Sequence, residues 1–219
     1  MGGGAYAFGK MPSVGDFFRL GAPRDFIAAW DPWLQSALLA GQQAMGAEWD
    51  NYYMSTPIWR FMLAPGLAGS SAVAGVLMPS VDRVGRRFPL TLLKPLEIND
   101  VISAHFGNDG FYEGMEDLAL AALEDDMTRD RLEEELAKLP DLAIPSAVTG
   151  HRALSGADVA SLHAGLAARA FAGRVNRPSL WTARLPDTAR MIVCNGLPAG
   201  GDLMGLFNLD AQVWQEGAA

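Results

Sequence analysis

The sequence predicts an α+β fold, in which helices pack on a central, mostly antiparallel sheet of about five or six strands. Short apolar runs with brief connections dominate the first half, and parallel neighbours would need crossovers of about a dozen residues or more. Segments with apolar residues at helical spacing dominate the second half. The 219 residues are 50% hydrophobic, enough for one good-sized core. We therefore expect a single domain over residues 1–219, and we leave the glycine-rich residues 1–4 out of the fold prediction.

Six segments are apolar runs of strand length, bounded mainly by turn residues. They lie at 5–10, 58–64, 72–78, 88–94, 179–185 and 189–195. The short connections among the three strands between residues 58 and 94 predict sequential antiparallel neighbours in one sheet. Residues 186–188, Pro-Asp-Thr, suit a hairpin turn between the last two. Residues 11–23 are too rich in proline and glycine to predict a regular element.

The first segment with apolar residues at helical spacing is residues 24–46. Pro32 follows Asp31 as an N1 proline follows an N-cap, so we expect a short helix that ends near Trp30 and a longer one that begins at Pro32. The second half predicts an amphipathic helix with Leu120 and Leu123 on its apolar face, then a charged helix that begins at Thr128. A further helix is expected at 155–173, and the tail, 202–215, is expected to end in a short helix that docks Trp214.

The charge balance excludes several classes of partner. A net charge of -8 argues against nucleic acid, because that polymer needs a basic face to neutralise its phosphates. An anionic membrane surface is disfavoured for the same reason. The single cysteine, Cys194, cannot form an intramolecular disulfide, and its apolar surroundings predict a core residue in a reducing compartment. No signal peptide and no apolar stretch of about 20 residues is present, so we expect a cytoplasmic protein without an integral membrane segment.

Catalytic and cofactor signals are weak. The segment "GKMPSVGD" lacks the spacing of a phosphate-binding loop, and "GLPAGGD" lacks a long helix behind it. The histidines, His105, His151 and His163, are far apart and predict no zinc site. Ser80 and Asp82 could be nominal members of a catalytic triad, but no G-x-S-x-G motif supports one. The sequence therefore predicts no cofactor, no metal and no catalytic residue.

The stretch "GVLMPSVDRVGRRFPLTL", residues 75–92, places one acid and three arginines between two apolar runs. Pro79 and Gly85 favour a tight loop there. Arginine offers a planar donor fork that suits carboxylates. In one interpretation, Asp82 or Asp16 pairs with an arginine and clamps two loops together; in the other, arginines of this loop remain free for an acidic or phosphorylated partner. The two can coexist. The candidate residues for a clamp or a partner contact are Asp16, Arg60, Asp82, Arg83, Arg86 and Arg87.

Five motifs follow one another along the chain: "GKMPSVGDFFR", "FIAAWDPWLQSAL", "STPIWRFMLAPG", "AGVLMPSVDRVGRRFPLTL" and "PSLWTAR". In this order they resemble the TagF family of type VI secretion accessory proteins. The resemblance covers residues 8–95 and, more loosely, 178–207, whereas residues 96–177 offer no signature that can be carried over from the family. Five motifs in this order are far more specific than any one alone.

The resemblance implies a single TagF-like domain in the cytoplasm of a Gram-negative bacterium. It also implies a non-enzymatic, posttranslational repressor of type VI secretion system assembly, which binds a forkhead-associated (Fha) scaffold protein. Two other classes of function remain open on the residues alone. One is a small-molecule hydrolase or transferase with its site at the 82–87 loop. The other is a structural scaffold or oligomer subunit, which a large exposed apolar patch would favour.

Overall fold

The computed structural model describes residues 4–143 and 159–215. Within these residues seven strands form one sheet, in the order β2-β1-β5-β4-β3-β6-β7, and every neighbouring pair is antiparallel. The strands are β1 Tyr6–Gly9, β2 Phe18–Leu20, β3 Trp59–Leu63, β4 Ala72–Met78, β5 Leu90–Leu96, β6 Pro178–Arg184 and β7 Ala189–Asn195. The predicted α+β class with a central antiparallel sheet is confirmed, with one strand more than the upper limit of the prediction.

The order of the sheet follows the apolar runs of the sequence. The prediction that β3, β4 and β5 are sequential antiparallel neighbours is confirmed, as is the hairpin of β6 and β7. The additional strand is β2, which pairs with β1 inside the segment that we expected to be irregular. It has only three residues, too few to show an alternating pattern among the surrounding glycines and prolines.

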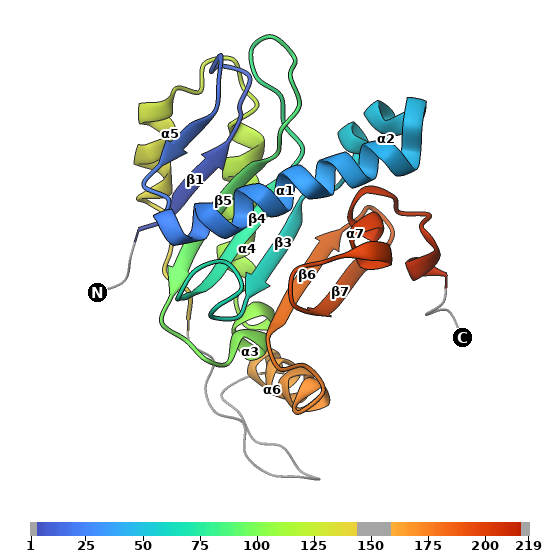
Figure 1. Ribbon diagram of the computed structural model, residues 1–219. Helices are drawn as coiled ribbons and strands as arrows, with labels where there is room; N and C mark the ends of the chain where they lie inside the picture. The colour runs from blue at the N-terminus through green and yellow to red at the C-terminus, as the bar shows by residue number, and fades with distance from the viewer. Residues whose placement is uncertain (1–3, 144–158, 216–219) are drawn as a thin grey trace.

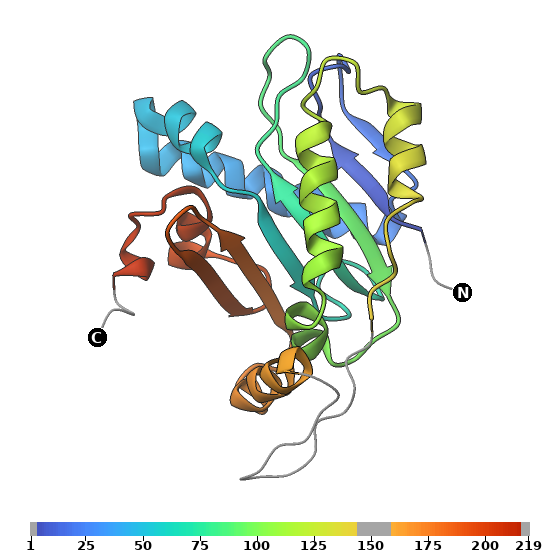
Figure 2. The ribbon, with the colours of Figure 1, turned by 180° about the vertical axis from the view of Figure 1, so that it is seen from behind.

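Helices cover both faces of the sheet (Figures 1 and 2). The face in front in Figure 1 carries α1 Arg24–Met45, η1 Gly46–Glu48, α2 Trp49–Ser55, α7 Gly200–Phe207 and η2 Gln212–Trp214. The face in front in Figure 2 carries α3 Val101–Phe106, α4 Asp109–Ala121, α5 Arg129–Leu136 and α6 Val159–Phe171. Each layer has its own apolar core against the sheet.

Tryptophans anchor the first layer. Trp30 is fully buried, stacks on Trp181 with ring centroids 6.0 Å apart, and donates its indole N–H to the Thr91 hydroxyl at 3.0 Å. Trp214 in the tail stacks on Trp59 at 6.2 Å. Each large ring thus buries its apolar surface, and the indole donor of Trp30 is satisfied.

The prediction that the first helical segment divides at Pro32 is wrong. Helix α1 continues through Pro32 from residue 24 to residue 45. Proline removes one backbone donor from the helix, a cost that packing on both sides of it offsets. Trp30 lies in the core just before the proline, and Trp33 just after it donates to the Pro198 carbonyl at 3.0 Å.

The second layer differs from the prediction at the end of α4. Leu120 and Leu123, expected on the apolar face, are exposed, because α4 turns only Phe111, Tyr112, Met115, Leu118 and Ala119 toward the sheet. Helix α5 has the predicted N-cap, with the Thr128 hydroxyl accepting the Arg131 N–H at 3.2 Å. Of the expected helix at 155–173, residues 155–158 lie outside the described residues, and α6 forms the rest.

Candidate functional site

Asp82 lies at the centre of the loop that joins β4 to β5. This loop projects beyond the end of the sheet (Figure 1) and closes on itself through an isolated bridge between Val81 and Arg87. The Asp82 carbonyl accepts the N–H of Gly85 at 2.8 Å. Gly85 has a φ of 81°, a conformation that favours glycine. The predicted tight turn is therefore present.

The Asp82 carboxylate is fully buried and fully engaged. It accepts from the Lys10 ammonium at 3.0 Å and from the Arg86 guanidinium Nε at 2.6 Å. It also accepts the backbone N–H groups of Val84 at 3.1 Å and of Arg86 at 2.9 Å. Burial opposes ionisation, but the hydrogen bonds from Lys10 and Arg86 outweigh it and hold the pKa of Asp82 well below its ordinary value. We call Lys10, Asp82 and Arg86 the Asp82 clamp.

The clamp fastens two loops together. The Arg86 guanidinium donates to the Gly15 carbonyl at 2.8 Å. The Arg83 backbone N–H donates to the Val14 carbonyl at 3.2 Å. The loop between β1 and β2 and the loop between β4 and β5 thus form one polar unit. Lys10, only 5% exposed, is the member that the sequence did not indicate, because it lies far from Asp82 along the chain.

The other candidate residues of this region lie outside the clamp. Asp16, the alternative acid, is exposed and accepts the N–H of its neighbour Phe17 at 2.8 Å. It forms no ion pair with any residue that the structure describes, and Asp82 occupies the buried position between Lys10 and Arg86. Arg87 pairs with Asp50 at 2.7 Å on the surface. Arg83 is exposed and makes no ion pair with any residue that the structure describes.

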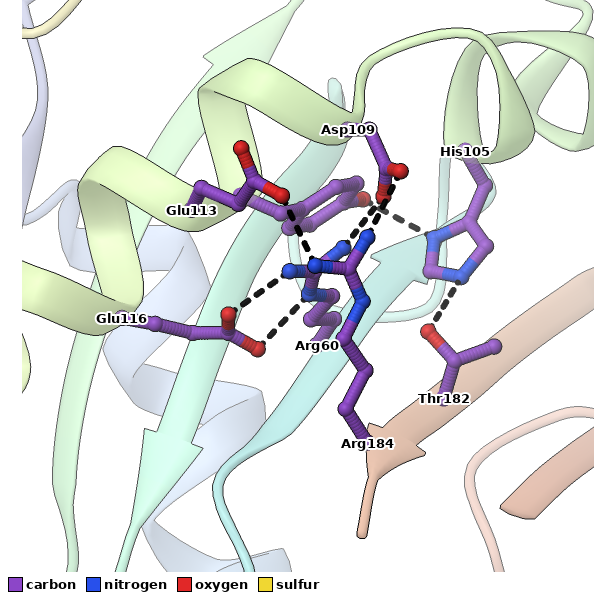
Figure 3. A network of polar contacts seen from close by, with 8 residues as sticks. Arg60, His105, Asp109, Glu113, Glu116, Thr182 and Arg184 are labelled. Carbon is purple, nitrogen blue, oxygen red and sulfur yellow. Dashed lines mark hydrogen bonds and ion pairs between the residues drawn. The ribbon is translucent and has the colours of Figure 1, made fainter. Parts of the chain in front are cut away.

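Arg60 belongs to a second polar cluster, between the sheet and α4 (Figure 3). Strand alternation turns Trp59 and Phe61 to the α1 side and Arg60 to the opposite side, which helices also cover. The Arg60 guanidinium is 5% exposed and donates two hydrogen bonds to the Glu116 carboxylate, of 2.7 and 2.6 Å. Its third bond reaches Asp109 at 2.6 Å.

Arg184 on β6 completes this cluster, which we call the Arg60 network: Arg60, Asp109, Glu113, Glu116 and Arg184. Arg184 reaches Asp109 at 2.6 Å and Glu113 at 2.7 Å. Asp109 therefore bridges two arginines from neighbouring strands, as Figure 3 shows. No sequence motif marks its acids, which come from a part of the chain where the resemblance offered no motif.

A buried histidine lies beside the network. His105 Nδ1 is 2.9 Å from the Tyr112 hydroxyl, and Nε2 is 3.0 Å from the Thr182 hydroxyl. Because the Tyr112 hydroxyl donates to the Phe61 carbonyl at 3.1 Å, we assign the ring proton to Nδ1. Burial, and then the positive charge of Arg60, lower the pKa of His105 to about 3. The ring is neutral near pH 7, with both nitrogens engaged.

A pocket of about 540 Å³ opens between α3, α6 and the β6–β7 hairpin, beside the Arg60 network. Arg60, His105, Asp109 and Arg184 line it, and each of them already has a side-chain partner within the protein. Among the described residues, no three histidine, cysteine, aspartate or glutamate side chains converge as metal ligands. No described helix has the length and apolar character needed to cross a membrane.

The fold and these two clusters define a class: a layered antiparallel α+β protein whose buried charges hold its elements together and whose exposed loop is fixed in shape. A sequence model of the TagF N-terminal domain, type VI secretion system-associated, matches residues 6–139. The chain therefore belongs to the TagF family of type VI secretion-associated proteins.

One solved structure supports this assignment over almost the whole chain. It is the crystal structure of PA0076 from Pseudomonas aeruginosa PAO1, which is 34% identical in sequence. The TM-score is 0.78, and the match covers 95% of this chain and 96% of the other. No curated protein matches.

Proposed function

We propose that this protein is a non-enzymatic, posttranslational repressor of type VI secretion system assembly, which acts in the cytoplasm by binding a forkhead-associated scaffold protein. Membership of the family supplies the connection with type VI secretion. The repressor role and the scaffold partner come from the resemblance of the ordered motifs. What the structure adds is a surface suited to such binding.

The observation that carries this proposal is the exposed tip of the clamped loop. Val84 is 71% exposed, and the neighbouring Arg83 has a free guanidinium among the described residues. The Asp82 clamp fixes the backbone of this tip before any partner arrives, and preorganisation of this kind lowers the entropic cost of binding. Arginine is one of the residue types enriched at interface hot spots, and Val84 adds exposed apolar area beside it.

Arg87 contributes less to this proposed surface, because Asp50 already neutralises it. Arg83 is therefore the cation that we assign to an acidic or phosphorylated partner. The alternative of a hydrolase or transferase at the 82–87 loop receives no support from Asp82, whose carboxylate already accepts four hydrogen bonds and is not available as a base.

The test compares Arg83→Ala and Arg87→Ala with the surface control Lys138→Ala. Arg83→Ala should weaken binding to the purified Fha scaffold about tenfold or more and relieve repression of secretion, because truncation of a hot-spot arginine has effects of this size. Arg87→Ala should weaken it less, and Lys138→Ala not at all. Circular dichroism checks folding, calorimetry measures affinity, and cells that overproduce each variant report secretion.

If the Arg83→Ala variant binds the scaffold and represses secretion like the parent, the loop is not part of the interface. Absence of any binding by the parent protein would refute the proposed partner. Turnover of a small molecule by the purified parent would refute the binding-only mechanism.

A further inference from the structure

The last strand of the sheet, β7, has one paired edge and one outer edge. The β6–β7 ladder is bounded by two backbone bonds: the Leu185 N–H to the Thr188 carbonyl and the Gly196 N–H to the Arg177 carbonyl, both 2.9 Å. Hydrogen-bonded pairs recur at every second residue of an antiparallel ladder. The backbone groups of Arg190, Ile192 and Cys194 therefore point toward β6. Those of Ala189, Met191 and Val193 point outward.

The outward groups of β7 have no backbone partner among the residues that the structure describes. The Ala189 carbonyl accepts only a long bond of 3.4 Å from the Thr188 hydroxyl. Proteins usually protect such an edge with a very short strand, a proline, a bulge or a charged side chain. The seven-residue β7 instead has alanine, methionine and valine at its outward positions, and Met191 is 47% exposed.

A hollow lies on each side of this edge. On the α6 side is the pocket of about 540 Å³, which Ala189 and Met191 line together with His163 of α6. On the η2 side is a hollow of about 420 Å³, which β7 lines together with Trp214. An added strand would turn alternate side chains to the two sides of the sheet. The hollow on the η2 side is lined by β7 from Ala189 to Val193, so it lies along the edge that an added strand would occupy.

The charge at this edge indicates the chemistry of the occupant. The Arg190 guanidinium lies 5.3 Å from the Trp214 ring, and its Nε is buried without a hydrogen-bond acceptor. No carboxylate of the described chain forms an ion pair with it, although Asp202 lines the same hollow. An incoming carboxylate could pair with the guanidinium charge of Arg190.

We propose that the outer edge of β7 binds an extended acidic segment of a partner protein, which adds an eighth strand to the sheet. Main-chain bonds to Met191 and Val193 would supply affinity, and an acidic side chain on Arg190 would supply selectivity. A second copy of this chain fits less well, because pairing two β7 edges would bring two unpaired arginines into one small interface. This surface is distinct from the 82–87 loop and does not depend on the proposed function.

The test uses a displayed library of random eight-residue peptides, selected on the purified protein. We expect enrichment of sequences that alternate acidic and β-branched residues. Bound peptide should slow hydrogen exchange at the amides of Met191 and Val193, which are unbonded in the free protein. Enrichment without acidic residues, or protection elsewhere in the sheet, would contradict the proposal.

Two substitutions at Met191 distinguish the contribution of its backbone N–H to binding from that of its side chain. Met191→Pro removes an outward N–H while leaving the β6–β7 ladder intact, since proline is tolerated on the outer side of an edge strand. It should weaken binding of the selected peptides about tenfold or more. Met191→Ala, which keeps the N–H, should change their affinity only about twofold. Equal effects of the two would overturn the strand-addition geometry.

A third variant makes the test independent of how well the proline variant folds. Arg190→Glu should reverse the charge preference, so that selection enriches basic peptides. An unchanged preference would overturn the role of Arg190. A parent protein that sediments as a dimer, together with a monomeric Met191→Pro variant, would assign the edge to self-association instead.

Discussion

The Asp82 clamp and the Arg60 network are opposite in charge and different in construction. In the clamp, a buried carboxylate lies between two cations, and backbone N–H groups of its own loop also bind it. In the network, a buried guanidinium lies between two carboxylates and bonds only to side chains. The charge of Asp82 therefore determines a backbone shape, whereas the charge of Arg60 determines how α4 lies on the sheet.

This difference predicts which part of the molecule each substitution should alter. Loss of the Asp82 carboxylate frees the N–H groups of Val84 and Arg86 in the turn and leaves Lys10 buried without its anion. Loss of Arg60 leaves two acids, of which Asp109 keeps Arg184 as its partner. The first change alters an exposed surface, and the second alters an internal contact. Three predictions, from the largest expected effect to the smallest, test this contrast.

The largest effect should come from Asp82→Ala. Leaving one partner of a buried ion pair uncompensated is strongly destabilising, so we expect the melting temperature to fall by roughly 10 °C or more. Asp16→Ala is the matched control, because Asp16 is exposed and bonds only to the adjacent backbone. Thermal unfolding followed by circular dichroism measures both. Similar falls for the two variants would remove the distinction between the buried acid and the exposed one.

A smaller effect should come from Arg60→Met, which keeps the length of the side chain and removes its charge. We expect a loss of about 2 kcal/mol in the free energy of unfolding, below the full cost of breaking a buried pair, because Asp109 is 67% exposed and water screens it. Arg184→Met is the control, with a side chain that is 53% exposed and an expected loss of about 0–1 kcal/mol. Urea denaturation measures the free energy of unfolding of both variants. Equal losses would show that burial of Arg60 does not increase its contribution to stability.

Near pH 7, the smallest effect is a dependence on pH that belongs to the Arg60 side of the molecule. Because the pKa of His105 is lowered to about 3, the unfolded chain takes up a proton at this residue below about pH 6.5 and the folded protein does not. The free energy of unfolding should therefore fall as the pH is lowered from about 6.5 toward 3, by up to roughly 1.4 kcal/mol per pH unit.

The variant His105→Gln isolates this contribution. It should lower stability at pH 7, because the hydrogen bonds to Tyr112 and Thr182 are disturbed, but it should also flatten the dependence between pH 4 and 6.5 by about one proton. Urea denaturation at pH 5 and pH 7 gives the slope for the parent and the variant. The same slope in both would show that His105 takes up its proton equally in the folded and unfolded states.

The sequence predicted those features whose signals are local. The three central strands and the β6–β7 hairpin follow from apolar runs and brief connections, and the pair of Asp82 and Arg86 spans only one turn of chain. The short strand β2 and the continuity of α1 through Pro32 could not be predicted, because tertiary packing decides both.

Each polar cluster also contains a residue from a distant segment of the chain. Lys10 reaches Asp82 only after β1 is placed near the end of β4, and Glu116 reaches Arg60 only after α4 packs on the sheet. Neither contact has a spacing that a single sequence reveals. The acids of α4 could have been suspected only from Arg60, whose charge in an apolar strand requires a partner.

The position of β3 in the sheet has a consequence for synthesis of the chain. Its neighbours are β4, which follows at once, and β6, with Arg60 opposite Thr182. At ribosomal rates of about 5–20 residues per second, β6 emerges roughly ten seconds after β3. During that interval the β3 edge that carries Trp59 and Phe61 has no strand beside it. An unpaired strand edge is a site where nascent chains can associate wrongly, so the interval before β6 emerges is when this chain is most exposed to such errors.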